Sequence, residues 1–283
     1  MVSALIVQLP SAPGKNVFRE WSGGMGSALD WTRPHWGHDP AFYDVPYAAY
    51  LYIARRLEDV GIPFAYFDLQ SRERIDLEEF DSLIADQRPD VLITQVNLPS
   101  LEKDLALVAR ARATNSRLKV ILVGSTAKWF KRRILSEGLA DVVMEESEEL
   151  LVAENVAALK ENALDQLQGC SVWRDGGIAT IAARMPMKDL DFIDFPAYSL
   201  LDFARYESAY YGGRKVRYAT VFTTKGCPYT CGYCPYPYGF GRRLIYRSPT
   251  RVGADIERLK REFGIEQICF RDQVFTINPR HVR

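Results

Sequence analysis

Short apolar runs alternate between Ala4 and Lys160 with segments in which apolar side chains recur every three or four positions. This alternation predicts a parallel β-sheet whose strands are joined by crossover helices. We expect five strands, at Ala4–Leu9, Pro63–Leu69, Val91–Val96, Lys119–Val123 and Asp141–Met144. We expect four helices between them, near Pro46–Val60, Leu77–Ala85, Leu101–Thr114 and Lys128–Glu137. The predicted fold class is α/β, a Rossmann-like doubly wound sheet with ligands at the carboxyl ends of its strands.

The connection between the first strand and the first helix is unusually long. It spans about 35 residues, whereas such connections usually take two to six. It contains Trp21, Trp31 and Trp36, and also His35 and His38. The segment is either a flap that packs its aromatic side chains onto the domain or a cover for a ligand. The two histidines are either metal or axial ligands or part of a solvated loop.

The pattern changes after the first domain. We expect a helical tail at Asn155–Asp165, a hairpin at Ser171–Ala183 and an acidic–apolar linker at Asp189–Pro196. A new strand at Tyr218–Thr223 leads into a cysteine-rich loop, and another is expected at Ile265–Phe270.

The helix between these two strands has clear boundary signals. Ser248 and Pro249 suit its N-cap and first turn, and Gly264 suits its end. The unit predicts the start of a partial β/α barrel, and the domains are expected at residues 1–160, 161–212 (linker) and 213–283. A parallel barrel needs about 200 residues, so we expect the chain to be a truncated piece of a longer enzyme.

Three of the five cysteines, Cys227, Cys231 and Cys234, have the spacing Cys-x3-Cys-x2-Cys. Three thiolates can hold three irons of a 4Fe-4S cluster and leave the fourth iron open to a ligand. Pro228 and Pro235 prevent an ordinary helix here, and nearby glycines let backbone amides approach a cluster. We expect four tyrosines to shield it from solvent, at positions Tyr229, Tyr233, Tyr236 and Tyr238.

Zinc is the competing interpretation of the cysteines. Cys231 and Cys234 form a common zinc half-site, and Cys227 could be a third ligand. A structural zinc site needs a fourth ligand, for which Cys269 and His281 are the nearby candidates. Cys269 lies in a predicted strand, where a buried inert thiol is the expected state, and Cys170 is expected to be a plain thiol.

Charge and composition exclude several classes of protein. The 36 basic and 36 acidic residues cancel, so no overall field favours nucleic acid. No signal peptide is evident, and no window approaches the roughly 18 apolar residues of a membrane span. An odd number of cysteines, three of them clustered, fits metal ligation in a reducing compartment, so we expect a cytoplasmic protein.

The cysteine loop, with the aromatic Tyr233 just before its last cysteine, resembles that of the radical S-adenosylmethionine family. The resemblance implies that Cys227, Cys231 and Cys234 ligate the cluster. It also implies that S-adenosylmethionine binds the open iron and is cleaved reductively to a 5'-deoxyadenosyl radical. Tyr233 and Asp272 are the implied S-adenosylmethionine contacts; for Asp272 the alternative is an exposed loop carboxylate. Lys225, Arg242 and Arg243 flank the loop. They either offset charge there, meet an anionic substrate, or form a solvated basic face.

A doubly wound domain, an acidic linker and then this loop together resemble the cobalamin-binding subgroup of that family, as does the segment Phe270–Thr276. Cobalamin is then implied at the carboxyl edge of the sheet. Its candidate contacts are Asn97, Gly124, Ser125, Thr126 and Glu146. The Asp-x-His-x-x-Gly signature is absent, which implies cobalamin without a histidine ligand. The alternative is a degenerate Rossmann-like domain that only docks the substrate.

The resemblance implies a cobalamin-dependent methyltransferase that acts on an unactivated carbon of a small-molecule or natural-product-like substrate. In the implied mechanism the radical abstracts a substrate hydrogen and methylcobalamin then transfers its methyl group. An external electron donor such as a flavodoxin or ferredoxin is implied, and no catalytic residue is assigned beyond the cluster. The alternatives are a radical cyclase or rearrangement enzyme without net methylation and, from another class, a zinc-stabilised binding module.

Overall fold

The computed structural model describes residues 2–10, 15–17, 19, 24–25, 28–30, 47–70, 77–205, 207–208 and 216–283. The three tryptophans and two histidines of the long loop lie outside these residues.

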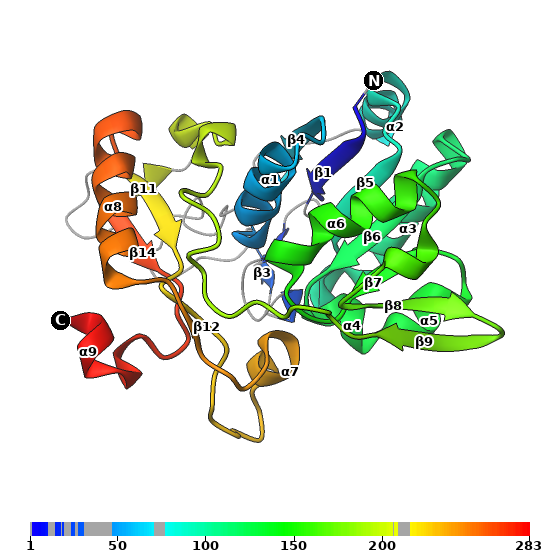
Figure 1. The fold of residues 1–283 in the computed structure, drawn as a ribbon. Helices are drawn as coiled ribbons and strands as arrows, with labels where there is room; N and C mark the ends of the chain where they lie inside the picture. The colour runs from blue at the N-terminus through cyan, green and yellow to red at the C-terminus, as the bar shows by residue number, and fades with distance from the viewer. Residues whose placement is uncertain are drawn as a thin grey trace.

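A seven-stranded sheet forms the first part of the molecule (Figure 1), with the strand order β4-β1-β5-β6-β7-β8-β9. Five of its strands are parallel: β1 (Ala4–Gln8), β4 (Phe64–Asp68), β5 (Val91–Gln95), β6 (Lys119–Val123) and β7 (Val142–Met144). This order puts a topological switch point between β1 and β5, where doubly wound sheets bind ligands. The predicted fold class and its five strands are confirmed.

The expected hairpin is also present and extends the sheet. It consists of β8 (Cys170–Arg174) and β9 (Gly177–Ile181), and β8 pairs antiparallel with β7. These residues come from the segment that we assigned to a linker. The antiparallel edge therefore belongs to the same sheet as the five parallel strands.

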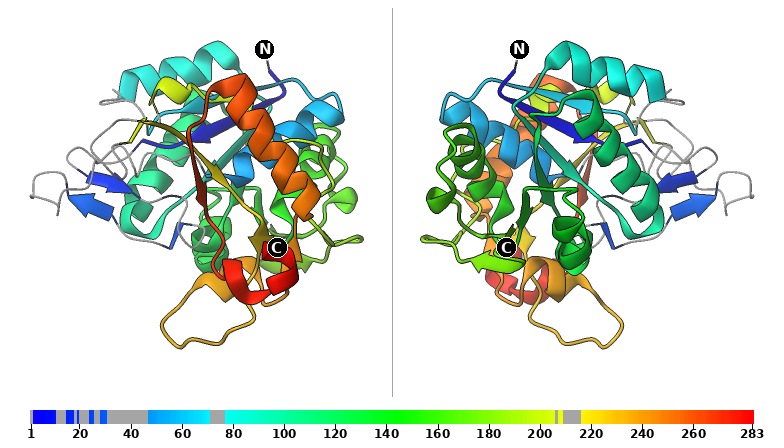
Figure 2. Two further views of the ribbon diagram at one scale, coloured as in Figure 1. Left: turned by 90° about the vertical axis from the view of Figure 1, so that its left-hand side faces the viewer. Right: turned by 90° about the vertical axis from the view of Figure 1, so that its right-hand side faces the viewer.

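Helices cover both faces of the sheet (Figures 1 and 2), which explains why its central strands are continuous apolar runs. On one face lie α1 (Ala49–Asp59) and α6 (Glu148–Lys160), packed on one another and on the side chains of Ala4 and Ile6. On the other face lie α2 (Leu77–Gln87), α3 (Leu101–Thr114), α4 (Ser125–Trp129) and α5 (Lys131–Ser136). Every residue of β1 and β5 is buried.

Two helix predictions are wrong in their boundaries. The helix expected at 128–137 starts earlier and is divided at Phe130, which caps both α4 and α5. The helical tail expected from Asn155 is the end of α6, which begins at Glu148 after the left-handed Ser147 (φ 52°). The acidic first turn of α6 resembles a loop in sequence, but Glu148 and Glu149 are buried by the second half of the chain.

The second half is built around the three-stranded sheet β10-β11-β14. Strand β11 (Val216–Val221) pairs antiparallel with β10 (Glu207–Ser208) and parallel with β14 (Gln267–Phe270). The parallel pair is joined through α8 (Pro249–Phe263), which begins and ends as predicted: Ser248 accepts a bond from the Arg251 amide, and Gly264 adopts φ 65°. Leu51 of α1 packs in the same apolar cluster as Leu259 of α8, so the two halves share part of a core.

The remaining elements are short. Two-stranded pairs are formed by β2 (Lys15–Val17) with β3 (Ala28–Asp30), and by β12 (Thr224–Lys225) with β13 (Ile245–Tyr246). Two further α-helices are α7 (Tyr236–Phe240) and α9 (Pro279–Val282). The 3-10 turns are η3 (Leu98–Ser100), η4 (Leu164–Gln166), η5 (Tyr198–Leu200), η6 (Phe203–Arg205) and η7 (Phe275–Ile277). None of the helices in the described ranges is long and apolar enough to span a bilayer.

The acidic linker is attached to the second half by Arg247, whose side chain is fully buried. Its guanidinium pairs with Asp255 of α8 on both carboxylate oxygens. It also donates to the backbone carbonyls of Leu190, Ile193 and Asp194. A planar group with five donors suits this simultaneous recognition of a carboxylate and three carbonyls.

Candidate functional site

The cysteine loop leaves the second sheet after β11 and is closed at its base by the β12–β13 pair (Figure 1). Cys227 lies at this base, 5% exposed, and its amide donates to the Gly241 carbonyl at 3.1 Å. Gly226 has φ 92°, and a Cβ there would lie 2.1 Å from the Arg243 carbonyl oxygen. Only glycine fits this close approach, so the backbone before Cys227 is sterically fixed.

The other two cysteines lie further out on the loop. Cys231 is exposed and Cys234 is half-buried, and all three thiols are free. Within the part of the chain that the structure describes, no three His, Cys, Asp or Glu side chains are grouped as a metal site. The donor set itself, three thiols on one irregular loop, is of the type that holds an iron–sulfur cluster.

The two candidate fourth ligands for zinc have other surroundings. Cys269 lies on β14, opposite Thr220 of β11. The imidazole Nε2 of His281 is 3.0 Å from the hydroxyl of Thr223, and its ring packs edge-on against Tyr246.

The four tyrosines that we expect to shield a cluster differ in their own exposure. Tyr236 is buried, but Tyr229, Tyr233 and Tyr238 are 54%, 90% and 47% exposed. Tyr238 lies on α7, and its ring packs edge-on against Trp129 of α4, with ring centres 5.0 Å apart. The loop before α7, which carries Tyr229 and Tyr233, projects away from the rest of the chain (Figure 2). The expected contact of Tyr233 with S-adenosylmethionine stays a prediction.

Asp272 is half-buried beside the start of the loop and is not an exposed loop residue. Its Oδ1 accepts bonds from the amide and hydroxyl of Thr223, at 2.9 and 3.0 Å, and from the amide and hydroxyl of Thr224. Its Oδ2 is buried and accepts no bond within the described part of the chain. Burial raises the pKa of this carboxyl although the threonine donors oppose the shift. One oxygen therefore fixes the strand end, and the other is available to a donor.

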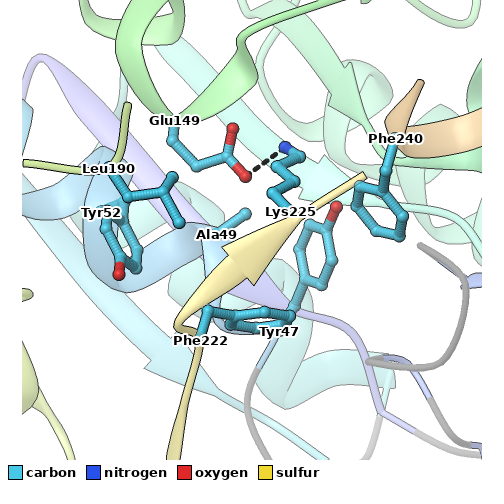
Figure 3. Close-up of a pocket in the computed structure, with 8 residues that line it drawn as sticks. All are labelled: Tyr47, Ala49, Tyr52, Glu149, Leu190, Phe222, Lys225 and Phe240. Atoms are coloured by element: carbon cyan, nitrogen blue, oxygen red, sulfur yellow. Dashed lines mark hydrogen bonds and ion pairs between the residues drawn. The ribbon is translucent and has the colours of Figure 1, made fainter. Parts of the chain in front are cut away.

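Lys225 is a buried ion-pair partner, so the interpretation as a solvated basic face is wrong for this residue. Its ammonium pairs with Glu149, lies 3.9 Å from Glu148, and stands 5.0 Å from the centre of the Phe240 ring (Figure 3). Arg242 and Arg243 are exposed, as that interpretation expects. The lysine borders a cavity of about 20 Å³ between the two halves, lined also by Tyr47, Ala49, Tyr52, Glu149, Leu190, Phe222 and Phe240.

Glu148 links this ion pair to the carboxyl edge of the sheet. Its carboxylate accepts bonds from the Gly124 amide, at 2.9 Å, and from the Tyr47 hydroxyl. Burial alone would raise the pKa of Glu148, but Lys225, Lys128 and the two hydrogen bonds outweigh it and lower that pKa. Glu146, which we predicted as a cobalamin contact, is exposed and accepts a bond from the Ala183 amide next to the β8–β9 hairpin. Its predicted contact with cobalamin is not tested by this placement.

Several buried polar atoms at the ends of β5 and β6 have no hydrogen-bond partner among the described residues. They are Gln95 Nε2, Asn97 Oδ1, Ser125 Oγ and Thr126 Oγ1. Each of the four residues is at most 1% exposed. A buried polar atom without a hydrogen-bond partner destabilises the fold by about 1–3 kcal/mol. Four such atoms at one edge of the sheet therefore indicate a place where a polar ligand would be stabilised.

Helix α7, which follows the cysteines, packs directly on this edge. A Cβ at Gly239 would lie 1.6 Å from Ser125 Oγ, so the backbone of α7 touches the first turn of α4. The buried ammonium of Lys128 donates to the Gly239 carbonyl. Burial lowers the pKa of Lys128 although the nearby glutamates oppose the shift. The loop that carries the thiols and the edge with the unmet polar atoms are thus in contact.

The comparisons with known proteins agree with this arrangement. Residues 39–154 match the B12 binding domain. An uncharacterized methyltransferase of Pyrococcus horikoshii is 26% identical over 244 residues, which cover 81% of this chain and 52% of that protein. An anaerobic magnesium-protoporphyrin IX monomethyl ester cyclase of Cereibacter sphaeroides is 26% identical over 83% of this chain and 38% of that protein.

A solved structure shares the fold. It is the radical S-adenosylmethionine methyltransferase TsrM from Kitasatospora setae, with cobalamin and a 4Fe-4S cluster bound; it is 15% identical with a TM-score of 0.65, over 98% of this chain and 49% of that one. The chain thus spans about half the length, or less, of the relatives it matches. The resemblance to the cobalamin-binding subgroup of the radical S-adenosylmethionine family is confirmed.

Proposed function

We propose that this chain, which contains a B12 binding domain and resembles radical S-adenosylmethionine enzymes, is part of a cobalamin-dependent methyltransferase. One observation carries the proposal. Helix α7, which follows the three cysteines, packs on the sheet edge that has buried polar atoms without hydrogen-bond partners. Two cofactors bound at these places would face the same region between the two halves. The substrate class is a small molecule with an unactivated carbon.

The thiolates of Cys227, Cys231 and Cys234 would hold the cluster. The cluster, when bound, supplies the electron that cleaves S-adenosylmethionine to a 5'-deoxyadenosyl radical. Asp272 would accept a hydrogen bond from the methionyl ammonium through Oδ2, while Oδ1 keeps the preceding strand end in place. Tyr233 would contact the same molecule.

Cobalamin would contact the carboxyl edge of the sheet. Asn97, Ser125 and Thr126 each offer a buried polar atom there, and Gly124 with φ 88° lets the chain turn into α4. Glu146 remains the fifth predicted contact. The alternative is a domain that only docks the substrate; the match of residues 39–154 to the B12 binding domain favours cobalamin over it.

A radical cyclase that uses the same parts without net methylation is the second candidate. It is supported by the similarity to two anaerobic magnesium-protoporphyrin IX monomethyl ester cyclases, from Cereibacter sphaeroides and Rubrivivax gelatinosus. An external electron donor and a reducing, cytoplasmic setting belong to both candidates, because a cluster with an open iron must be kept reduced.

Anaerobic reconstitution tests the cluster assignment. The purified chain is treated with iron and sulfide and examined for bound iron, visible charge-transfer absorbance and a paramagnetic signal after reduction. Cys231→Ala should lose the intact cluster and the cleavage of S-adenosylmethionine, whereas Cys269→Ala should retain both. Retention of zinc but not iron, with loss of zinc in Cys269→Ala, would support the zinc-stabilised binding module instead.

Hydroxocobalamin binding tests the second cofactor. Thr126→Val removes a hydroxyl that has no partner among the described residues. We expect it to weaken corrinoid binding by roughly tenfold, with the apo-protein as stable as before because no bond is lost. Ser136→Ala, on the exposed end of α5, is the control. Absence of corrinoid binding in the unmodified chain would contradict the methyltransferase proposal while leaving radical chemistry possible.

A further inference from the structure

Four buried charged side chains meet where the two halves of the chain touch. Glu148 and Glu149 come from the first turn of α6, Lys128 comes from α4, and Lys225 comes from β12. Each is at most 8% exposed. Two negative and two positive charges balance one another, which is the condition under which buried charges are tolerated.

Lys225 is the member of this group that belongs to the cysteine-bearing half. It reaches across the boundary to Glu149, 76 positions earlier in the sequence, and its ammonium lies 5.0 Å from the centre of the Phe240 ring. Cys227 follows only two positions later. The backbone between them is fixed by the close approach of Gly226 to Arg243 and by the bond from the Cys227 amide to Gly241. The Lys225 side chain therefore ties this fixed segment, with Cys227 in it, to the first half of the chain.

The acids that receive Lys225 are tied to the opposite cofactor edge. Glu148 accepts from the Gly124 amide at the turn into α4, two positions before Thr126. Glu149 is its neighbour in the same helical turn. A continuous series of polar contacts thus runs from the turn at Gly124 to the residue that precedes the cysteines.

We propose that Lys225 is a positioning residue whose ion pair with Glu149 sets the place of Cys227 relative to the carboxyl edge of the B12 binding domain. The inference rests on the proposed function. If both cofactors bind, the ion pair explains how their two sites, which lie on different halves of the chain, keep a constant relative position. An apolar contact would hold the halves together without fixing this register. A buried ion pair does so because any shift of the loop separates the two charges in a medium that solvates them poorly.

Hydrogen exchange on the full-length chain without cofactors tests the positioning directly. Lys225→Met keeps most of the stem and removes the charge. We expect the amides of residues 226–241 to exchange at least roughly tenfold faster, with those of β1 and β5 unchanged. Lys119→Met is the control, because Lys119 pairs with Asp141 while 45% exposed at the other end of β6.

A double variant separates positioning from a merely structural role. Lys225→Met leaves Glu149 buried and unpaired, so the Tm should fall by roughly 5 °C or more. In Lys225→Met/Glu149→Met no unpaired charge remains, and the Tm should recover. We expect the fast loop exchange to persist, and the reduced cluster of the reconstituted protein to give an altered paramagnetic line shape.

Two results would overturn the inference: unchanged loop exchange in Lys225→Met, or recovery of slow exchange in the double methionine variant. Neither depends on a bound cofactor. A chain that binds no corrinoid but shows the expected exchange pattern would contradict the proposed function and leave the positioning role intact. If the chain binds both cofactors but Lys225→Met shows no change in loop exchange, the proposed function stands and the positioning role is contradicted.

Discussion

Every residue of β1 and β5 in the first sheet is buried, whereas the strand β14 and the cysteine loop of the second half are mostly half-buried or exposed. Two large apolar clusters cover the two faces of the first sheet, and a smaller one supports the second. The first sheet is thus stabilised by apolar burial on both faces in addition to its strand pairing.

Buried charges occur in both regions: Arg19 pairs with Asp104 in the first half, and the second half, with its smaller apolar core, carries Arg247 and Lys225. Arg247 binds the linker carbonyls and Asp255, and Lys225 binds Glu149 of the other half. Such groups contribute little net stability when paired but cost much when one partner is lost. From their different cores we expect the first sheet to tolerate conservative apolar exchange, and the smaller second half to be the more sensitive of the two to the loss of a single buried charge.

The strongest test of this difference is Arg247→Met. It leaves Asp255 buried without its partner and three carbonyls without a donor. We expect a loss of about 3–5 kcal/mol in the local stability of α8 and β11, measured by native-state hydrogen exchange. Arg251→Met, whose ion pair with Asp194 is largely exposed, should cost less than about 1 kcal/mol. Equal losses of stability in Arg247→Met and Arg251→Met would show that burial of the charge does not matter, and would contradict the comparison of the two regions.

A core truncation probes the first region. Leu122→Ala on β6 removes a side chain that is fully buried in the cluster under α2 and α3. The expected cost is roughly 2–5 kcal/mol, and Leu122→Met should cost less than about 1.5 kcal/mol. Denaturant unfolding followed by amide exchange in β5 and β6 measures both. A large loss of stability in Leu122→Met would show that this core is as sensitive to a conservative substitution as the buried ion pairs are to the loss of a charge.

The stability of the contact between the two regions should depend on pH through the ionisation of Glu148. Its pKa in the folded protein lies below the ordinary value of 4.5, so its pairing stabilises the fold above that value and is lost as the pH falls below it. Glu148→Gln should cost about 1–3 kcal/mol near neutral pH, and the difference from the unmodified chain should shrink below pH 4.5. Denaturant titrations at several pH values check the sign. A difference that grows at low pH would contradict the assignment.

The contact between α7 and α4 can be broken sterically. Gly239→Ala places a methyl group within 1.6 Å of Ser125 Oγ, so α7 should move away at a cost of about 1–3 kcal/mol. Exchange of the α7 amides reports the displacement. Ser125→Gly in the same chain removes the obstructing hydroxymethyl group and should restore slow exchange. Failure of this rescue would indicate that α7 is held elsewhere.

The smallest loss of stability is expected from the exposed aromatic pair at the edge of the contact between α7 and α4. Trp129 and Tyr238 pack edge to face with ring centres 5.0 Å apart, and both are largely exposed. Trp129→Ala should cost about 0.5–1.5 kcal/mol in the docking of α7, with no change in the first sheet. The exchange experiment on α7 measures it.

The sequence by itself determined the five parallel strands, the hairpin, the limits of α8 and the loop with three cysteines. These features follow from local patterns: apolar runs, a Ser-Pro start, a glycine stop and cysteine spacing. It did not determine where α6 begins, that Lys225 is buried, or that Glu148 and Glu149 rather than Glu146 face the loop. Lys225 and Glu149 are 76 positions apart. Whether such side chains meet or face water depends on how the two halves of the chain pack together, and only the tertiary structure decides that.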